Sequence, residues 1–216
     1  MVELERIDTQ KAYNLIKEKI ITLQLKPGAP IDEDALCAET GLTPTAVREA
    51  LKWLAHDHLV DITPRHGIRV AEANPAELRE LFEMRLPLET LCARMAAERA
   101  TADDIVVMDA LVREYERVKG AGNVDTLLDL DHRFHGALAD AAHNRYMRET
   151  LERFFGLSER LWYLASPQID WVLRALDRHA ELVQAIKARD AERAADLMHQ
   201  HVLDFQALVE RALGLV

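Results

Sequence analysis

The apolar residues of this chain recur mainly at spacings of three and four positions, which is typical of helices that bury one face. The first such stretch, residues 9–23, places its apolar side chains at Tyr13, Ile16, Ile20 and Leu23. Pro27 and Gly28 follow it. Because proline and glycine both resist helix continuation, we predict that the first helix ends before them.

Two short helices joined by a tight turn are predicted next. Asp32 can cap a helix over residues 32–39, and Gly41 supplies the turn after it. Thr43 can cap a second helix over residues 43–56. The apolar side chains of that helix lie on one face, at Val47, Ala50, Leu51 and Leu54. Its other face is therefore left to polar side chains.

A small ribbon follows the second of these helices. Residues 59–62 and 68–70 favour strands, and residues 64–67 favour the turn between them. A helix presented by a turn and backed by a ribbon is the layout of a winged helix-turn-helix, which reads DNA. Residues 41–70 are therefore called the reading head below.

The second part of the chain is nearly all helical in pattern. Helices are predicted over residues 75–99, 102–119, 124–142, 144–163, 169–188 and 190–212. Pro87 lies inside the first of them and should kink it or offset its register. We therefore predict a mainly α protein, with a winged helix-turn-helix domain over residues 1–73 and an all-α antiparallel helical bundle over 74–216.

Charge constrains the predicted DNA binding. The chain has 27 lysines and arginines against 37 aspartates and glutamates, a formal net charge of -10. This sign opposes indiscriminate binding to nucleic acid. Residues 43–69 differ, because their four cations (Arg48, Lys52, Arg65 and Arg69) slightly outnumber three acids. The acidity therefore lies mostly outside the reading head.

The two cysteines and the hydropathy pattern indicate a cytoplasmic protein without a membrane partner. Cys37 and Cys92 lie in helical patterns without CxxC spacing, so we expect reduced thiols in a reducing compartment. No apolar run approaches membrane-spanning length, and the N-terminal residues have no signal-peptide character.

The polar face of the second short helix carries candidate DNA contacts. Arg48 can bind guanine or phosphate in a bidentate manner, and Lys52 one turn later can add a phosphate contact. Thr43 and Thr45 lie at the helix N-terminus, where hydroxyls and free amides suit a phosphate. Arg65 and His66 at the ribbon turn could reach an adjacent groove. The alternative is that these charges form only a solvated helix face.

The stretch from Tyr13 to Val70 resembles the N-terminal domain of the GntR family of bacterial transcription regulators. The matching residues are Pro27-Gly28, Leu36-Cys37-Ala38, Gly41-Leu42-Thr43, Val47-Arg48-Glu49-Ala50-Leu51, Leu59-Val60 and Gly67. The resemblance implies that Thr43, Thr45 and Arg48 contact DNA. It also implies that His66 and Gly67 form the tip of the wing.

Two positions depart from that family. Relatives often carry a DNA-contacting arginine where this chain has Pro44, which has no side-chain donor. Some relatives place another such arginine where this chain has Asp34, which would repel phosphate. The family assignment survives both changes, but an operator sequence cannot be transferred from better-known members.

A second group of residues has the composition of a metal site. Asp131 and His135 are four positions apart and therefore project from one helical face. His179 and His201 are 22 positions apart, which suits facing positions on two antiparallel helices. One carboxylate and three imidazoles would suit a borderline divalent metal with open coordination positions. The alternative is an ordinary surface pair of Asp131 and His135 with two unrelated histidines.

Residues 76–209 resemble the FCD ligand-binding domain, which marks the FadR-like branch of the GntR family. The resemblance rests on the Arg85-x-x-x-Glu89 helix, on Asp131-x-x-x-His135 followed by Asn144, and on His179 and His201. It implies that Asp131, His135, His179 and His201 bind a metal, zinc first, with nickel or manganese as alternatives. It further implies a small organic acid as effector, contacted by Arg85. The alternative for Arg85 is a pair with Glu89 on the helix surface.

The two groups of residues together support three functional hypotheses. The first is a homodimeric repressor that binds a pseudo-palindromic DNA operator and is released when its metal-containing bundle binds a small carboxylate. The second is an all-helical metal hydrolase using the same four ligands, although no general base accompanies them. The third is a DNA-binding protein in which the metal is purely structural.

Overall fold

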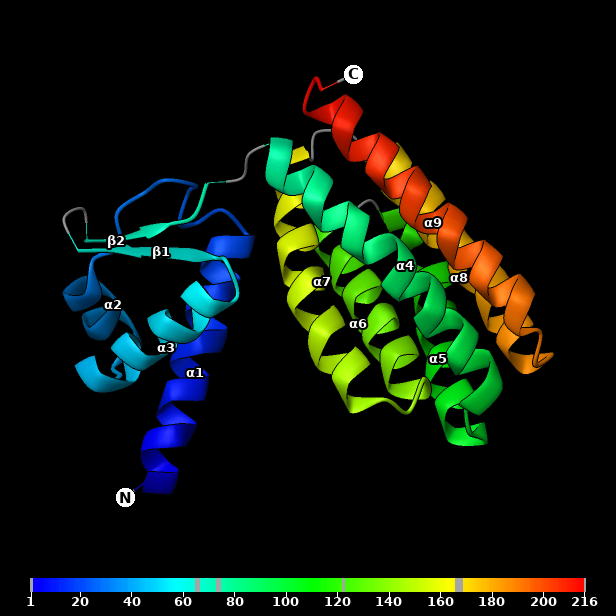
Figure 1. Cartoon of the computed structure of the whole chain (residues 1–216), viewed down its shortest axis with the longest axis horizontal. Coiled ribbons are helices and arrows are strands. Elements are labelled where there is room, and N and C mark those ends of the chain that lie inside the picture. Colours follow the sequence, from blue (N-terminus) through cyan, green and yellow to red (C-terminus); the bar gives the residue numbers. More distant parts are fainter. Residues whose placement is uncertain (1, 65–66, 73–74, 122, 166–168, 216) are drawn as a thin grey trace. The chain divides into compact units, whose positions relative to one another are not determined.

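The structure of the protein is a computed structural model that describes residues 2–64, 67–72, 75–121, 123–165 and 169–215. Its internal contacts divide the chain into two compact units (Figure 1). The first comprises Met1–Asn74 with Gly156–Leu164, and the second comprises Pro75–Phe155 with Ala165–Val216. Each unit has its own core and is described separately.

The first unit begins with a helix that is longer than predicted. Helix α1 spans Val2–Ile21, whereas the apolar spacing predicted a start near residue 9. Residues 2–8 contain no proline or glycine and include three good helix formers, Glu3, Leu4 and Glu5. They lack the regular apolar spacing, which is why periodicity alone did not reveal the first turns.

The two short helices of the reading head have the predicted caps. Helix α2 covers Glu33–Thr40, and the carboxylate of Asp32 accepts a hydrogen bond of 3.0 Å from the amide of Ala35. Gly41 ends it in the left-handed region, with φ of 70°. Helix α3 covers Pro44–His56, and the hydroxyl of Thr43 accepts from the amide of Ala46 at 3.2 Å. These caps satisfy amides that have no partner inside a helix.

The ribbon is a two-stranded antiparallel sheet with an additional edge segment. Strand β1 is Val60–Thr63 and strand β2 is Gly67–Val70, each within one residue of the prediction. Pro30 forms a bridge with Arg69 on the other side of β2. The amide of Ile31 donates to the carbonyl of Ile68 at 2.9 Å. The segment after α1 therefore covers the β2 edge, which the sequence analysis did not predict.

The core of the first unit fixes the orientation of α3. Helices α1 and α3 pack against each other, and the ribbon closes the remaining side. The buried apolar residues include Ala12, Ile16, Ile20, Leu36, Val47, Ala50, Leu51, Leu54, Leu59, Val60 and Val70. Because the four predicted apolar positions of α3 all belong to this core, its polar face is turned to solvent.

The second unit is the predicted helical bundle. Its helices are α4 (Pro75–Arg99), α5 (Ala102–Val118), α6 (Val124–Ala141), the beginning of α7 (Arg145–Ala165), α8 (Ile169–Lys187) and α9 (Ala191–Ala212). Residues 156–164 of α7 group with the first unit. A short 3-10 turn, Lys119–Ala121, was not predicted. Helix α4 continues through Pro87. Within the part of the chain that the structure describes, no helix is long and apolar enough to cross a membrane.

Four helices of the bundle converge on its centre. Helix α9 packs along α4, and Figure 1 shows the two side by side. Helix α8 contacts α9, and both α4 and α8 contact α6. The positions of these four helices bring residues from distant parts of the sequence into one core.

The cap of α3 provides a test of the local structure. Thr43→Ala removes the acceptor for the Ala46 amide, so we expect the free energy of unfolding to fall by about 1 kcal/mol. Thr43→Ser keeps the hydroxyl and should lose little of that stability. Urea unfolding followed by circular dichroism measures both; equal losses in the two variants would contradict the capping role.

Candidate functional site

The second unit brings Asp131, His135, His179 and His201 together. Asp131 and His135 come from α6, His179 from α8 and His201 from α9. One potential ligand atom from each lies within 4.8 Å of all the others. The predicted surface pair is therefore excluded for His135, because all three imidazoles are buried. We call these four residues the ligand cluster.

The separations within the ligand cluster approach those of a metal site. Nε2 of His135 lies 3.1 Å from Nε2 of His201 and 3.7 Å from Oδ1 of Asp131. Nε2 of His179 lies 3.4 Å from the same carboxylate oxygen. In a tetrahedral zinc site with Zn–N bonds of about 2.0–2.1 Å, neighbouring ligand atoms lie about 3.3 Å apart. A pair at the upper limit of 4.8 Å would have to approach by about 1.5 Å.

Two atoms of the ligand cluster require a partner. Oδ1 of Asp131 and Nε2 of His179 are buried and form no hydrogen bond with the described residues. Leaving such groups unpaired costs about 1–3 kcal/mol each. A divalent cation between them would bind both the carboxylate and the imidazole lone pair, so the residues present fit a metal.

The electrostatics of the cluster favour the metal-binding form of His179. Burial, and then the charges of His201 and His135, hold the pKa of His179 well below its usual value. The imidazole is therefore neutral, as a metal ligand must be. Its ring stacks on Phe134 with centroids 3.9 Å apart. For Asp131, burial has the larger effect and raises the pKa of the carboxyl.

Glu89 of α4 links the ligand cluster to Arg85. Nε of Arg85 donates to Oε1 of Glu89 at 2.6 Å, and Oε2 of Glu89 lies 3.1 Å from Nδ1 of His135. The predicted pair of Arg85 with Glu89 therefore forms. It is buried and not on the helix surface, because the two side chains are only 4% and 1% exposed.

The Arg85–Glu89 pair is held in a fixed charge state and position. Burial acts to raise the pKa of Glu89, but the charges of Arg85 and His135 outweigh it and lower that pKa to about 2. The guanidinium carbon of Arg85 lies 5.3 Å from the ring centroid of Phe82 and 5.1 Å from that of Phe205. The sequence analysis noted Glu89 as a partner of Arg85 but missed its contact with His135.

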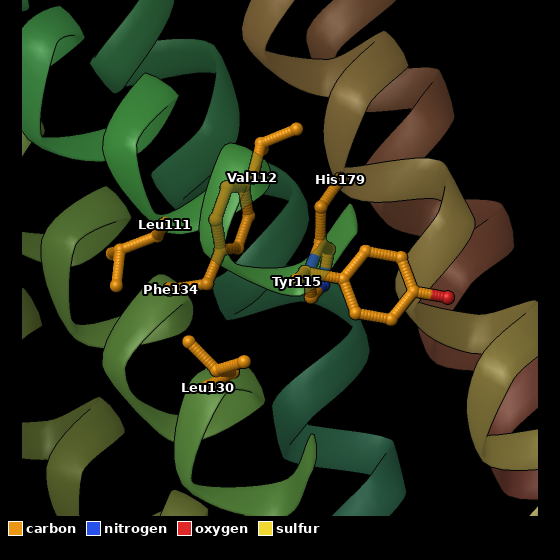
Figure 2. A pocket seen from close by; sticks show the side chains of 6 residues that line it. All are labelled: Leu111, Val112, Tyr115, Leu130, Phe134 and His179. Carbon is orange, nitrogen blue, oxygen red and sulfur yellow. The ribbon is translucent and has the colours of Figure 1, made fainter. Parts of the chain in front are cut away.

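A small cavity lies beside the cluster and shares His179 with it. Its walls are Leu111, Val112, Tyr115, Leu130, Phe134 and His179 (Figure 2). The space that the centre of a water molecule can reach there is about 10 Å³, which suits about one water. This cavity alone is therefore too small for an organic acid.

The reading head presents its predicted contacts to solvent. Thr43, Thr45, Arg48 and Lys52 are all exposed on α3. Nε of Arg48 donates to Glu33 of α2 at 2.7 Å, and Lys52 pairs with Glu49 at 2.6 Å. Exposed ion pairs contribute about 0–1 kcal/mol, so either cation can exchange its partner for a phosphate at small cost.

Of the three residues predicted at the wing, the structure describes Gly67. Gly67 is exposed and has φ of 73°, a left-handed conformation that glycine adopts without strain. Arg65 and His66 lie outside the described residues. Pro44 and Asp34 are both exposed, so neither is removed from the DNA-facing surface by burial. The sequence analysis missed Glu33, the neighbour of Asp34, as the partner of Arg48.

Comparison with known families gives one match for each unit. Residues 8–70 match the family described as bacterial regulatory proteins, gntR family, and residues 80–204 match the FCD domain. The chain is 28% identical over 195 residues to an uncharacterized HTH-type transcriptional regulator, YdhC, of Bacillus subtilis (strain 168), covering 88% of this chain and 84% of YdhC. It is 26% identical over 222 residues to the HTH-type transcriptional repressor GlaR of Escherichia coli (strain K12), covering 96% and 98%.

Solved structures share the fold of the chain. Escherichia coli McbR/YncC superposes with a TM-score of 0.83 at 21% identity, covering 94% of this chain and 97% of that one. A GntR regulator from Rhodococcus sp. RHA1, whose function is described as putative, gives a TM-score of 0.75 at 22% identity, covering 96% and 98%. At these identities the likeness establishes the fold.

The buried histidine predicts how the metal-free protein responds to acid. The unfolded chain binds more protons than the folded chain between the lowered pKa of His179 and its ordinary value of 6.5. The free energy of unfolding therefore keeps its full contribution from His179 above pH 6.5. It falls as the pH drops below that value. We expect His179→Gln, which cannot take up this proton, to lose less stability than the wild type between about pH 7 and pH 5.

Urea unfolding at a series of pH values, with a chelator present, measures this difference. The raised pKa of Asp131 acts in the opposite direction in both proteins, so the comparison isolates His179. Parallel curves for the two proteins would show that His179 is not held neutral by its burial.

Proposed function

Because the chain belongs to the GntR family of bacterial regulatory proteins and carries an FCD domain, we propose that its helical bundle is a metal-containing sensor of small carboxylates that controls DNA binding. The family resemblance predicted from the sequence is confirmed. The protein is a DNA-binding transcriptional regulator, and its relatives and fold are those of regulators and not of enzymes. The hydrolase alternative is therefore set aside.

The observation that carries the proposal is the ligand cluster in the core of a regulator's bundle. Three imidazoles and one carboxylate suit zinc first, with nickel or manganese as alternatives. Asp131, His135, His179 and His201 would hold the ion. With four protein ligands, a metal that takes six can still accept a carboxylate, and that coordination chemistry is what the ion supplies when bound.

Arg85 is the proposed partner for the effector's carboxylate. It is a buried cation in the same helix as Glu89 and close to the ligand cluster through that residue. A carboxylate that approaches the cluster must either share Arg85 with Glu89 or displace Glu89 from it. Such an exchange is favourable only if the acid also gains a second contact, which an open metal position provides.

The proposed regulator works as a homodimer. Two copies of α3 reading half-sites about one helical turn apart would bind a pseudo-palindromic operator, since one near-neutral head gives limited affinity. Thr43, Thr45, Arg48 and Lys52 would contact the operator from α3, and Arg65, His66 and Gly67 from the wing. The relative GlaR is named a repressor, which favours repression relieved by the effector. Effector binding would shift the population of arrangements of the two heads.

A thermal-shift screen of organic acids tests the sensor. We expect the zinc-loaded protein to melt at a higher temperature with its effector, by roughly 5–10 °C at about 100 times Kd. The neutral amide of the same acid, and the same acid with chelated protein, are the controls and should give little shift. If no carboxylate in a broad set of small acids raises the melting temperature, the metal is structural and the sensor proposal fails.

Substitution of Arg48 tests the reading head. Arg48→Ala should weaken binding to the DNA upstream of the protein's own gene by about 10-fold or more, without changing metal content. Arg113→Ala is the matched control, because it removes the same charge from an exposed position on α5. His135→Ala should lower metal content and leave metal-independent DNA binding unchanged. Equal effects of Arg48→Ala and Arg113→Ala would contradict the assignment of α3.

A further inference from the structure

The two ring nitrogens of His135 face different partners. Nε2 faces the ligand cluster, 3.1 Å from His201 and 3.7 Å from Asp131. Nδ1 lies on the opposite side of the ring, 3.1 Å from Oε2 of Glu89. An imidazole that binds a metal through Nε2 carries its proton on Nδ1. In that form the proton of His135 would be on the ring nitrogen that lies nearest to Glu89.

Glu89 is placed to receive this proton's hydrogen bond and not to bind the metal itself. Its other oxygen, Oε1, accepts from Arg85 at 2.6 Å, and the side chain is 1% exposed. The guanidinium carbon of Arg85 also lies within 5.3 Å of the ring centroids of Phe82 and Phe205, and these cation–π contacts help to hold it in place. The carboxylate is therefore fixed with one oxygen toward the arginine and the other toward the far side of His135.

The contact between Glu89 and His135 is within reach but incomplete in this structure. The distance of 3.1 Å is that of a hydrogen bond, but the angle is not, and Nδ1 of His135 and Oε2 of Glu89 form no other hydrogen bond. Completing it requires a change in the orientation of the imidazole. The ligand cluster must also contract from its widest separation of 4.8 Å to hold an ion, so its side chains have to move in any case.

We infer that Glu89 is a positioning residue for the metal: it fixes His135 with its proton on Nδ1 and ties that histidine to Arg85. The inference rests on the metal site proposed above and adds a residue outside the four ligands. Outer carboxylates of this kind commonly change metal affinity by about 10- to 100-fold. Here the same carboxylate also neutralises the arginine proposed to bind the effector.

The chain contains a matched arrangement whose histidine, His132, follows Asp131 directly but is not one of the four ligands. Nη1 of Arg148 donates to Oε2 of Glu152 at 2.6 Å, and Nε2 of His132 lies 3.6 Å from Oε1 of Glu152. The residue types are the same, but His132 is not among the converging ligands and Glu152 is 35% exposed. Glu152→Gln therefore removes an equivalent carboxylate without touching the site.

Glu89→Gln tests the inference because an amide cannot satisfy both neighbours. Its oxygen is needed to accept from Arg85, so its amino group faces Nδ1 of His135 and favours a lone pair there. The proton of His135 then moves to Nε2, where the ion should bind. We expect zinc to bind about 10- to 100-fold more weakly than to wild type, with Glu152→Gln unchanged.

Two measurements on the full-length protein give the readout. Competition with a zinc chelator gives the affinity, and nitrogen NMR of the imidazoles in metal-free protein reports which nitrogen of His135 carries the proton. We expect Nδ1 in the wild type and Nε2 in Glu89→Gln. A loss of packing alone would not exchange the protonated nitrogen.

A second variant guards against a folding defect. Glu89→Gln leaves a buried arginine without its counter-charge, whereas Arg85→Met together with Glu89→Met removes both charges. If Glu89→Gln does not fold, the zinc affinity of the double variant tests the role of Glu89 instead. We expect the double variant also to bind zinc about 10- to 100-fold more weakly than wild type. Wild-type affinity in either folded variant overturns the role of Glu89 and leaves the metal site standing. A wild-type protein that binds none of zinc, nickel and manganese overturns both proposals.

Discussion

The convergence of one carboxylate and three buried imidazoles in a helical core is the constraint on which the second unit depends. Apolar residues would pack there without penalty, whereas Asp131 and His179 each carry a buried atom without a hydrogen bond. The helices α6, α8 and α9 must converge closely enough for the four side chains to share a partner. A cation would offset that cost, and its binding would then be coupled to the folding of the bundle. The centre of the unit is therefore also its most condition-dependent part.

The reading head differs from this core, because its charged side chains are exposed and form only weak ion pairs. Arg48 and Lys52 are paired with Glu33 and Glu49, so in the absence of DNA their charge is largely compensated. These pairs are solvent-screened and exchange easily for phosphates. A head built in this way binds DNA in a salt-sensitive manner and gains selectivity from geometry more than from charge. Such a head suits a regulator whose output depends on the positions of two copies.

Features that depend on neighbouring residues were predictable from the sequence. The caps Asp32 and Thr43 and the turn at Gly41 were correct because a few adjacent atoms determine them. The bundle helices end within two residues of the predicted positions, since caps such as Thr101 and Asp190 mark their starts. Features that depend on packing were not predictable. The edge segment at Pro30 and the burial of the Arg85–Glu89 pair both require knowing which elements meet.

The same distinction applies to the ligand cluster and its surroundings. The spacing of Asp131 and His135 predicted a shared helical face, but only the packing of α8 and α9 brings His179 and His201 to it. Glu89 was visible as a partner of Arg85, whereas its approach to His135 depends on how α4 lies against α6.

The Arg85–Glu89–His135 arrangement gives the proposed sensor a physical route between its two ligands. Glu89 cannot give up Arg85 to an incoming carboxylate without leaving a buried anion that only His135 then stabilises. The loss of Arg85 therefore favours the tautomer of His135 that carries its proton on Nδ1. This is the tautomer that can bind a metal through Nε2. Linkage requires the reverse effect to be equal: a bound metal, by orienting His135 toward Glu89, weakens the hold of Glu89 on Arg85. Acid and metal would then favour each other's binding through one buried carboxylate, apart from any direct contact between them.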